Sequence, residues 1–389
     1  MRLEEIQKAL REEKLDGWLF FDHHRRDPLA YRVLQFSPNS PVTRRWYYYI
    51  PADGEPKALV HRIEAQTLAE LPGQTEKYSD WGEMLERIGQ MLAGSKRVAM
   101  QYSPKCAVPY VAMVDAGTVE LIQSLGVEVV TSANLIQFFE SRWTRDQLDS
   151  HMEAGRRVDR IRREAFERIG AKVRASERVT EWEMQQFILS RYREDGLVID
   201  HGPDVAVNGN ASNPHYEPKQ DACSEIKQGD LVLIDMWAKL DKPESVYYDI
   251  TWVGYCGETP PAEIERVFTV VREARDKAVT RVQVAVATRQ TLHGFEVDDA
   301  ARQVIQKEGF GEYFFHRTGH SIGIEVHGTG ANMDNLETHD DRQVIPWTCF
   351  SVEPGIYLPK FGIRSEVDVF VDENRAIITG EAQEKIVRI

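Results

Sequence analysis

The amino-acid sequence predicts an α/β domain followed by an α+β domain, and three observations support this prediction. Residues 1–143 alternate apolar strand patterns with helical patterns, which is typical of a layered α/β sheet. From residue 144 the pattern changes to long charged helices, followed by paired strands that suit an antiparallel sheet. At 389 residues, the chain is also longer than one typical hydrophobic core allows. We therefore expect domains at 1–143 and 144–389.

The first domain is expected to consist of short strands joined by helices. Helical periodicity is present at 3–14, 63–70, 82–93 and 113–125. Strands are expected at GWLFF, WYYYI, KALVH, RVAMQY and VEVV. The aromatic segment Trp46–Tyr49 suits either a core strand or a subunit interface, and the core strand is the preferred interpretation.

The second domain is expected to open with two helices. The first covers 144–176, and the second begins at Thr180, where Glu183 three residues later completes a capping box. Further helices are expected at 261–286 and 298–308, and strands at 231–238, 246–254, 348–353, 363–371 and 375–379. Antiparallel strands flanked by helices make this an α+β domain.

Charge and composition narrow the classes of function. A net charge of -14 argues against nucleic acid and against an anionic membrane surface as partners. No stretch approaches 18 uninterrupted apolar residues, and the N-terminal segment lacks the apolar core of a signal peptide. The four cysteines form no CxxC pair, which suits reduced thiols and a cytoplasmic location.

Four carboxylates and one histidine are candidates for a metal site: Asp235 in LVLIDMWA, Asp249 in YYDIT, His320 in HRTGHSIG, Glu353 in SVEPGIY and Glu366 in RSEVDVFV. The four acidic stretches are interpreted as strands, each with one acid in an apolar run. Burying an unpaired carboxylate costs several kcal/mol, so four of them need a shared source of positive charge. Two divalent cations bridged by hydroxide supply it, and such a pair is typical of hydrolases. Oxygen ligands with one imidazole suit Mn²⁺, Fe²⁺, Co²⁺ or Zn²⁺.

Two further histidines are expected near this site. His327 in GIEVHGTG follows His320 by seven residues, and His215 lies in the polar loop NGNASNPHYEP. Either could stabilise an oxyanion or carry a proton. The other histidines are interpreted as residues outside the site, with His151 and His339 expected at the surface; the rest of this group are His23, His24, His61 and His293.

These residues resemble the pita-bread metallopeptidases, the group that includes Xaa-Pro aminopeptidases, prolidases and methionine aminopeptidases. The resemblance rests on the ordered set Asp, Asp, His, Glu, Glu and on its contexts: LVLID, DIT, S-V-E-P-G and R-x-E. It implies two divalent metal ions, Mn²⁺ first, with Co²⁺, Zn²⁺ or Fe²⁺ as alternatives. It also implies that Asp249 and Glu366 bridge both ions, that Asp235 binds one, and that His320 and Glu353 complete the other.

The resemblance assigns roles to other residues as well. Glu353 would accept the proton of the bridging hydroxide and pass it to the leaving nitrogen. His215 and His327 would bind the oxyanion or the residue after the scissile bond, and His316 would line the substrate pocket. Arg364 would support Glu366 from behind and contribute to substrate binding.

The first 143 residues look like the N-terminal domain of creatinases, prolidases and Xaa-Pro aminopeptidases, which methionine aminopeptidases lack. Creatinase does not keep the five ligands, whereas all five are present here. Resembling proteins are commonly homodimers. The chain departs from the family pattern at the 14-residue interval between Asp235 and Asp249, and at Met236, Trp237 and Trp252, bulky residues that would reshape the pocket.

Three functions are therefore distinguished. The leading hypothesis is an exopeptidase that hydrolyses the Xaa-Pro bond of dipeptides or longer peptides with a metal-bridging hydroxide. The alternative is a metal-dependent hydrolase of a small non-peptide amide or cyclic amidine, because one fold hosts several activities. The third is a peptide-binding scaffold with a vestigial site, and the intact ligand set argues against it.

Overall fold

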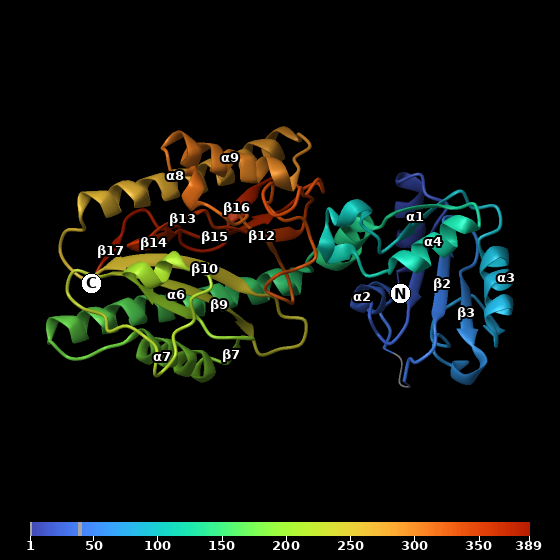
Figure 1. The fold of residues 1–389 in the computed structure, drawn as a ribbon, viewed down its shortest axis with the longest axis horizontal. Coiled ribbons are helices and arrows are strands. Elements are labelled where there is room, and N and C mark those ends of the chain that lie inside the picture. The colour runs from blue at the N-terminus through green and yellow to red at the C-terminus, as the bar shows by residue number, and fades with distance from the viewer. Residues whose placement is uncertain (1, 38–40) are drawn as a thin grey trace. The chain divides into compact units, whose positions relative to one another are not determined.

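The computed structural model describes residues 2–37 and 41–389 and divides the chain into two compact units, Met1–Glu140 and Ser141–Ile389 (Figure 1). The sequence placed the boundary three residues later, at the start of the long helix. Because each unit has its own hydrophobic clusters, each is described separately.

The first unit is built on a six-stranded sheet in the order β4-β3-β2-β1-β5-β6. Its strands are β1 (Gly17–Asp22), β2 (Trp46–Pro51), β3 (Lys57–His61), β4 (Gln74–Tyr78), β5 (Arg97–Met100) and β6 (Glu128–Thr131). Its α-helices are α1 (Leu3–Glu12), α2 (Pro28–Leu34), α3 (Trp81–Met91), α4 (Ala116–Ser124) and α5 (Ala133–Ile136). Only β2 is antiparallel to its neighbours, so the other five strands end at the same edge.

Both faces of this sheet are covered, because alternate residues of each strand enter different clusters. Trp46 and Tyr48 pack with α1 and α2, whereas Tyr47 and Tyr49 pack with α3 and α4. The aromatic segment is therefore a buried core strand. The helix expected at 63–70 is wrong: a single 3-10 turn at Arg62–Glu64 is followed by turns, and strand β4 comes next.

The second unit places helices outside mostly antiparallel sheets, in which β10 and β17 form a parallel pair. One sheet has the order β17-β10-β9-β7, with β8 also paired to β9, and another has the order β11-β12-β15-β16. The helices are α6 (Arg145–Arg174), α7 (Glu181–Glu194), α8 (Ala262–Thr288) and α9 (Gly294–Lys307). The strands are β7 (Leu197–Val198), β8 (Asp204–Val207), β9 (Leu231–Leu240), β10 (Tyr248–Tyr255), β11 (Ser321–Ile322), β12 (Thr348–Val352), β13 (Gly355–Leu358), β14 (Phe361–Arg364), β15 (Val367–Val371), β16 (Ala376–Ile378) and β17 (Val387–Arg388).

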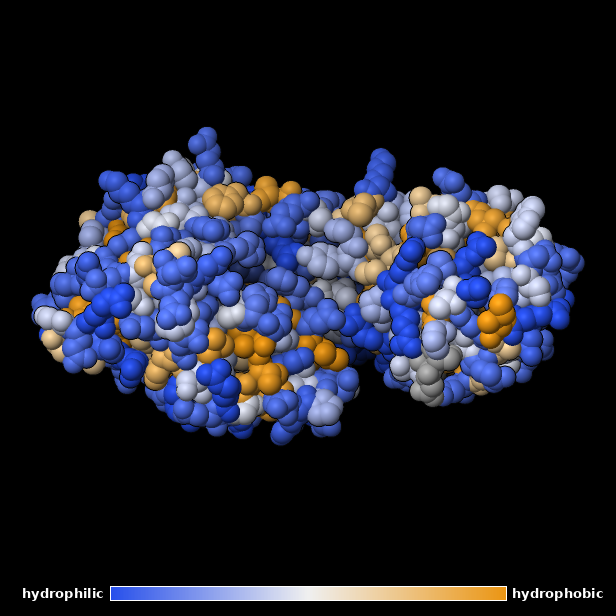
Figure 2. All heavy atoms as spheres, turned by 60° about the horizontal axis from the view of Figure 1, so that its bottom comes forward, coloured by the Kyte–Doolittle hydropathy of each residue, from blue (hydrophilic) through white to orange (hydrophobic). Residues whose placement is uncertain are grey.

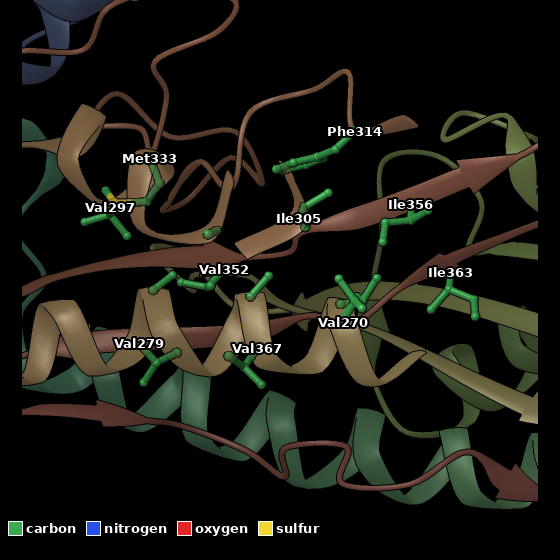
Figure 3. Packing of buried hydrophobic residues seen from close by; sticks show 14 of the residues in the cluster. Val270, Val279, Val297, Ile305, Phe314, Met333, Val352, Ile356, Ile363 and Val367 are labelled. Carbon is green, nitrogen blue, oxygen red and sulfur yellow. The ribbon is translucent and has the colours of Figure 1, made fainter. Parts of the chain in front are cut away.

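Each helix pair buries an apolar face against the strands. Helices α6 and α7 pack on β8, β9 and β10, and both begin with a complete capping box, at Thr144 and at Thr180. Helices α8 and α9 pack on the other side, where Val270 and Val279 lie in one cluster with Val352 and Val367 (Figure 3). The strands are thus held from both sides, which gives the polar residues between them fixed positions.

Two predicted strands differ from their expected bounds. The stretch expected at 363–371 is divided into β14 and β15, with Ser365 and Glu366 between them. Strand β12 ends at Val352, so Glu353 lies just beyond it. Only Asp235 and Asp249 are therefore strand residues, and both glutamates lie at strand ends.

The face drawn in Figure 2 is mostly hydrophilic, with hydrophobic patches on both units. Among the described residues, no helix has both the length and the apolar composition needed to cross a membrane. All four cysteines are free thiols, two of them buried.

Candidate metal centre

Asp235 and Asp249 face the same side of the β9–β10 hairpin. Asp235 pairs with Thr251 and Asp249 pairs with Trp237, so the two aspartates are diagonal neighbours two positions apart on adjacent strands. Alternation along a strand puts all four of these residues on one face. The long turn between the strands leaves this register intact.

His320 reaches the same place from the segment that precedes β11. Its backbone N–H donates to Ser351 Oγ at 3.0 Å, and Ser351 N–H donates to its carbonyl at 2.9 Å. Gly319 permits this close approach, because a Cβ there would lie 1.9 Å from the Ser351 carbonyl oxygen. The imidazole is thereby fixed against β12.

The side chains of Asp249, His320 and Glu366 converge: one ligand atom of each lies within 4.8 Å of the others. His320 Nε2 is 3.6 Å from Asp249 Oδ2 and 3.4 Å from Glu353 Oε1. All three residues of the cluster are buried, and Glu353 is half-buried. Four of the five residues expected at the site therefore meet directly.

Asp235, the fifth, makes contact with Arg364, whose guanidinium donates to it. Thr251 lies between the groups: its hydroxyl is 2.9 Å from Asp235 Oδ1 and 2.7 Å from Glu366 Oε2, and it accepts from Arg364 Nε at 3.0 Å. Arg364 was expected to support Glu366. In the structure it contacts Asp235, lies 3.8 Å from Glu353 Oε2, and is linked to Glu366 through the Thr251 hydroxyl.

The cluster holds several buried carboxyl groups close together, and their pKa values are raised for that reason. Burial and the neighbouring carboxylates raise the pKa values of Asp249 and Glu366 well above their usual range. Burial also raises the pKa of Glu353, to about 7, although Arg364 opposes the shift. Burial lowers the pKa of His320 well below its usual value, so the imidazole is neutral and has a free lone pair.

These observations fit divalent cations. Within the described part of the chain, Asp249 Oδ1 is buried and has no hydrogen-bond donor, a costly state for a carboxylate. Arg364 forms ion pairs with Asp235 and Glu353, and one positive charge cannot balance four acids. Oxygen donors with one imidazole match Mn²⁺, Fe²⁺, Co²⁺ or Zn²⁺.

Of the three other histidines expected near the site, the structure brings His327 into contact with the cluster. The His327 ring meets the His320 ring edge-on, with centroids 4.4 Å apart. The pKa of His327 is lowered to about 4, first by burial and then by the positive charges of Arg317 and His215. Part of its side chain is nevertheless open to solvent. His316 Nε2 lies 2.7 Å from the Tyr357 hydroxyl, which also accepts from Arg364 Nη1 at 3.2 Å. His215 is exposed in its loop.

The bulky residues near the aspartates correct one expectation. Met236 and Trp252 lie on the opposite face of the hairpin, in the cluster formed with α6 and α7. The Trp252 ring packs under Arg162, 3.4 Å from its guanidinium carbon. Only Trp237 is on the side of the acids, where its Nε1–H donates to Asp200 at 3.0 Å. Met236 and Trp252 therefore do not reshape the pocket.

His151 was expected at the surface, and that expectation is wrong. It is fully buried in α6, where Nδ1 is 2.6 Å from the Tyr247 carbonyl and Nε2 is 2.7 Å from Thr379 Oγ1. Burial lowers its pKa to about 4, so it is a neutral core residue. Helix α6 is rich in charged residues, and its sequence did not indicate that His151 lies on the buried face of the helix.

Sequence reasoning also missed polar residues that support the site: Thr251, Tyr357, Asp204 and Asp368. Asp204 pairs directly with Asp235 across β8 and β9, and burial with that neighbouring charge raises its pKa to about 8. Asp368 accepts the Asp249 backbone N–H at 2.8 Å. Its place two residues after Glu366, in the same apolar run, was the available signal.

The chain joins an α/β unit to an α+β unit, and the α+β unit buries a cluster of carboxylates with one histidine. This combination defines a class of two-domain metalloenzymes. The model of metallopeptidase family M24 matches residues 150–373, more than half of the chain. The chain belongs to metallopeptidase family M24, it is an enzyme of that family, and its second unit has the pita-bread fold. Divalent metal ions are implied by this membership.

Individual relatives agree with this assignment. The chain is 25% identical over 346 residues to the probable dipeptidase PepE of Mycobacterium tuberculosis, covering 87% of this chain and 84% of that protein. It is 32% identical over 152 residues to the Xaa-Pro dipeptidase of Pyrococcus furiosus, covering 39% and 40%. The crystal structure of dipeptidase PepE from Mycobacterium ulcerans superposes with a TM-score of 0.70 at 22% identity, covering 100% and 97% of the two chains.

Proposed function

We propose that this protein is a dinuclear-metal exopeptidase that hydrolyses the bond between an N-terminal residue and proline, in dipeptides or longer peptides. The observation that carries the proposal is the convergence of Asp249, His320 and Glu366, with Glu353 beside them and Asp235 across the hairpin. The match to a protein named Xaa-Pro dipeptidase supports the choice of bond.

The donor set accounts for two cations better than for one. Asp249, Glu366, Glu353 and Asp235 together carry four negative charges when ionised, and His320 adds a neutral nitrogen. We assign Asp249 and Glu366 to both cations, Asp235 to one, and His320 with Glu353 to the other. When bound, two divalent cations lower the pKa of a water and polarise a carbonyl. Mn²⁺ is our first choice, followed by Co²⁺, Zn²⁺ and Fe²⁺.

The protein's own groups then move the proton and hold the substrate. Glu353 is oriented by Ser351, whose hydroxyl donates to Oε1 at 3.1 Å. Its carboxylate accepts a proton from the attacking water and delivers it to the proline nitrogen as the bond breaks. His327 and His215 donate to the carbonyl oxygen as negative charge develops there.

We assign the wall of the substrate pocket to a second set of side chains. His316, Tyr357 and Arg364 form a connected hydrogen-bonded chain that ends at Asp235. Such a chain holds each member in one orientation, which a substrate-positioning surface requires. We assign His316 and Arg364 to substrate binding. Because Met236 and Trp252 face the helices, they give no reason to prefer the small-amide alternative.

The test combines metal analysis with a peptide panel. The purified protein is loaded with Mn²⁺ or Co²⁺, its metal content is measured, and hydrolysis of Ala-Pro, Ala-Pro-Phe and Ala-Ala is followed. We expect about two metal ions per chain and cleavage of the proline peptides only. Loaded enzyme that leaves both proline peptides intact contradicts the proposal, and hydrolysis of a cyclic amide by the same enzyme would favour the alternative.

Two further assignments accompany the function. A homodimer and a cytoplasmic location are proposed from the resemblance and from the unpaired cysteines. Sedimentation of the purified protein tests the first, and fractionation of cells that express it tests the second.

A further inference from the structure

The first unit has a cavity at the edge of its sheet where the parallel strands end. Its volume is about 540 Å³. Strand β1 contributes Phe21, β3 contributes His61 and β4 contributes Tyr78, each at or next to the last residue of its strand. Ligands of open, mostly parallel α/β sheets bind outside the carboxyl ends of the strands, so the position is a favourable one.

Arginines converge on this cavity from two loops. Arg26 follows β1, while Arg44 and Arg45 precede β2, which is antiparallel and therefore begins at the same edge. Within residues 2–37 and 41–389, none of these three guanidinium groups has a carboxylate within 4.0 Å that would form an ion pair. His23 also lines the cavity; its pKa is lowered by burial and by His24, Arg26 and Arg45, as expected in a positive field.

Three acidic residues beside the cavity already accept hydrogen bonds from the protein. Asp80 caps α3 by accepting from the N–H groups of Gly82 and Glu83, and Asp115 caps α4 by accepting from Thr118. Glu64 accepts from the backbone N–H groups of Thr43 and Arg44. Hydrogen bonds and helix N-termini stabilise these three carboxylates where they are. Burial opposes the shift, but hydrogen bonds from Thr43 and Arg44 and the charge of Arg44 lower the pKa of Glu64, so Glu64 partly balances Arg44.

One side of the cavity is aromatic. Trp81, the first residue of α3, lines it and is 73% exposed, an unusual position for the largest apolar side chain. Tyr78 and Phe21 continue this wall and are buried. The loop after β1 also holds His24 and Arg25 at positive φ, 65° and 55°, a strained conformation that clusters at binding sites.

We propose that this cavity binds a small organic anion that carries a phosphate or carboxylate group next to a flat apolar group. Arg26, Arg44 and Arg45 would donate to the anionic group, as planar guanidinium groups do to phosphate and carboxylate. The flat group would lie against Trp81. None of these residues belongs to the second unit, so the proposal adds a binding site to the peptidase activity.

The test measures binding to the whole, metal-free protein, so that no anion can bind to a metal ion. Inorganic phosphate, phenyl phosphate and benzoate are titrated while heat release and tryptophan fluorescence are recorded. We expect one saturable site, with phenyl phosphate bound more tightly than inorganic phosphate. Comparison of phenyl phosphate with benzoate distinguishes the two anionic groups.

Variants assign the site. Arg26→Ala and Arg44→Ala should each weaken phenyl phosphate roughly tenfold, because each removes a charge-assisted hydrogen bond. Trp81→Phe should abolish the fluorescence response and keep phosphate binding. Arg11→Ala is the matched control: it makes the same charge change beside the turn that follows β2, at the opposite edge of the sheet.

Three results would overturn the proposal. The first is the absence of saturable binding of all three anions, and the second is equal weakening by Arg11→Ala. The third is a change of oligomeric state in the Arg26→Ala and Arg44→Ala variants without a change in anion affinity, which would make the cavity a subunit interface. Peptide hydrolysis is measured separately, so none of these results depends on the proposed peptidase activity.

Discussion

Replacing Thr251 with valine tests whether one hydroxyl holds the metal site together. Thr251 Oγ1 is 2.9 Å from Asp235 Oδ1 and 2.7 Å from Glu366 Oε2, and it accepts from Arg364 Nε at 3.0 Å. A hydroxyl has one hydrogen, so it donates to one carboxylate at a time. Valine keeps the shape and removes the hydroxyl.

The expected magnitude follows from these contacts. Losing a hydrogen bond to a charged group and leaving a buried guanidinium N–H unpaired costs about 1.5–3 kcal/mol. Loss of a residue that orients a metal ligand typically reduces metal affinity or activity by about 10–100-fold. That range corresponds to about 1.4–2.7 kcal/mol, so the two estimates agree.

The assay is a competition titration of Mn²⁺ against a fluorescent chelator, with peptide hydrolysis recorded in parallel. We expect Thr251→Val to lose about 10–100-fold in metal affinity. Thr348→Val is the matched control, since that buried strand threonine donates to the Ile345 carbonyl at 2.7 Å, away from the ligand side chains. Metal affinity of Thr251→Val within twofold of the wild type would refute the reasoning.

Three other predictions concern stability and turnover. Asp249→Asn should abolish peptide hydrolysis. In thermal melting, its metal-free form should be at least as stable as the metal-free wild type, because the substitution removes a buried carboxylate that has no hydrogen-bond donor. Addition of a chelator should no longer lower the melting temperature of this variant. His151 has its pKa lowered to about 4 in the folded state, so the unfolded chain binds the extra proton between about pH 6.5 and 4 and stability falls as the pH drops through that window. Urea unfolding should show that His151→Gln removes about 3 kcal/mol of this pH dependence, and an unchanged slope would contradict a neutral buried imidazole. Trp252→Phe should leave kcat/KM within twofold and lower the stability by about 1 kcal/mol through the lost contact with Arg162, whereas a large change in KM would place Trp252 in the pocket after all.

The local signals in the sequence were reliable where one element decides the outcome. The capping box at Thr180 and the core strand at Trp46–Tyr49 depend mainly on nearby residues, and both appear in the structure as expected. The helix expected at 63–70 failed, because a short amphipathic pattern does not distinguish a helix from a series of turns.

Facing directions across elements were harder to predict. His151 was expected at the surface because a lone histidine is usually a surface residue, yet its Nδ1 and Nε2 contact Tyr247 and Thr379, which come from distant segments. Met236 and Trp252 were assigned to the pocket because they are close to the aspartates in sequence. Alternation along a strand sends neighbouring residues to opposite faces, so closeness in sequence was misleading.

The sequence alone determined which residues could form the site, because four acids in apolar segments are costly to bury unless cations balance their charge. Only the tertiary structure decided how they meet. The register of β9 and β10 sets Asp235 diagonal to Asp249, and the break between β14 and β15 delivers Glu366 to the Thr251 hydroxyl. The structure also brought Arg364 to Asp235, and Asp204 opposite it. The physical reason is that the neighbours of a buried charge come from strands far apart in sequence, and strand pairing determines which of them share a face.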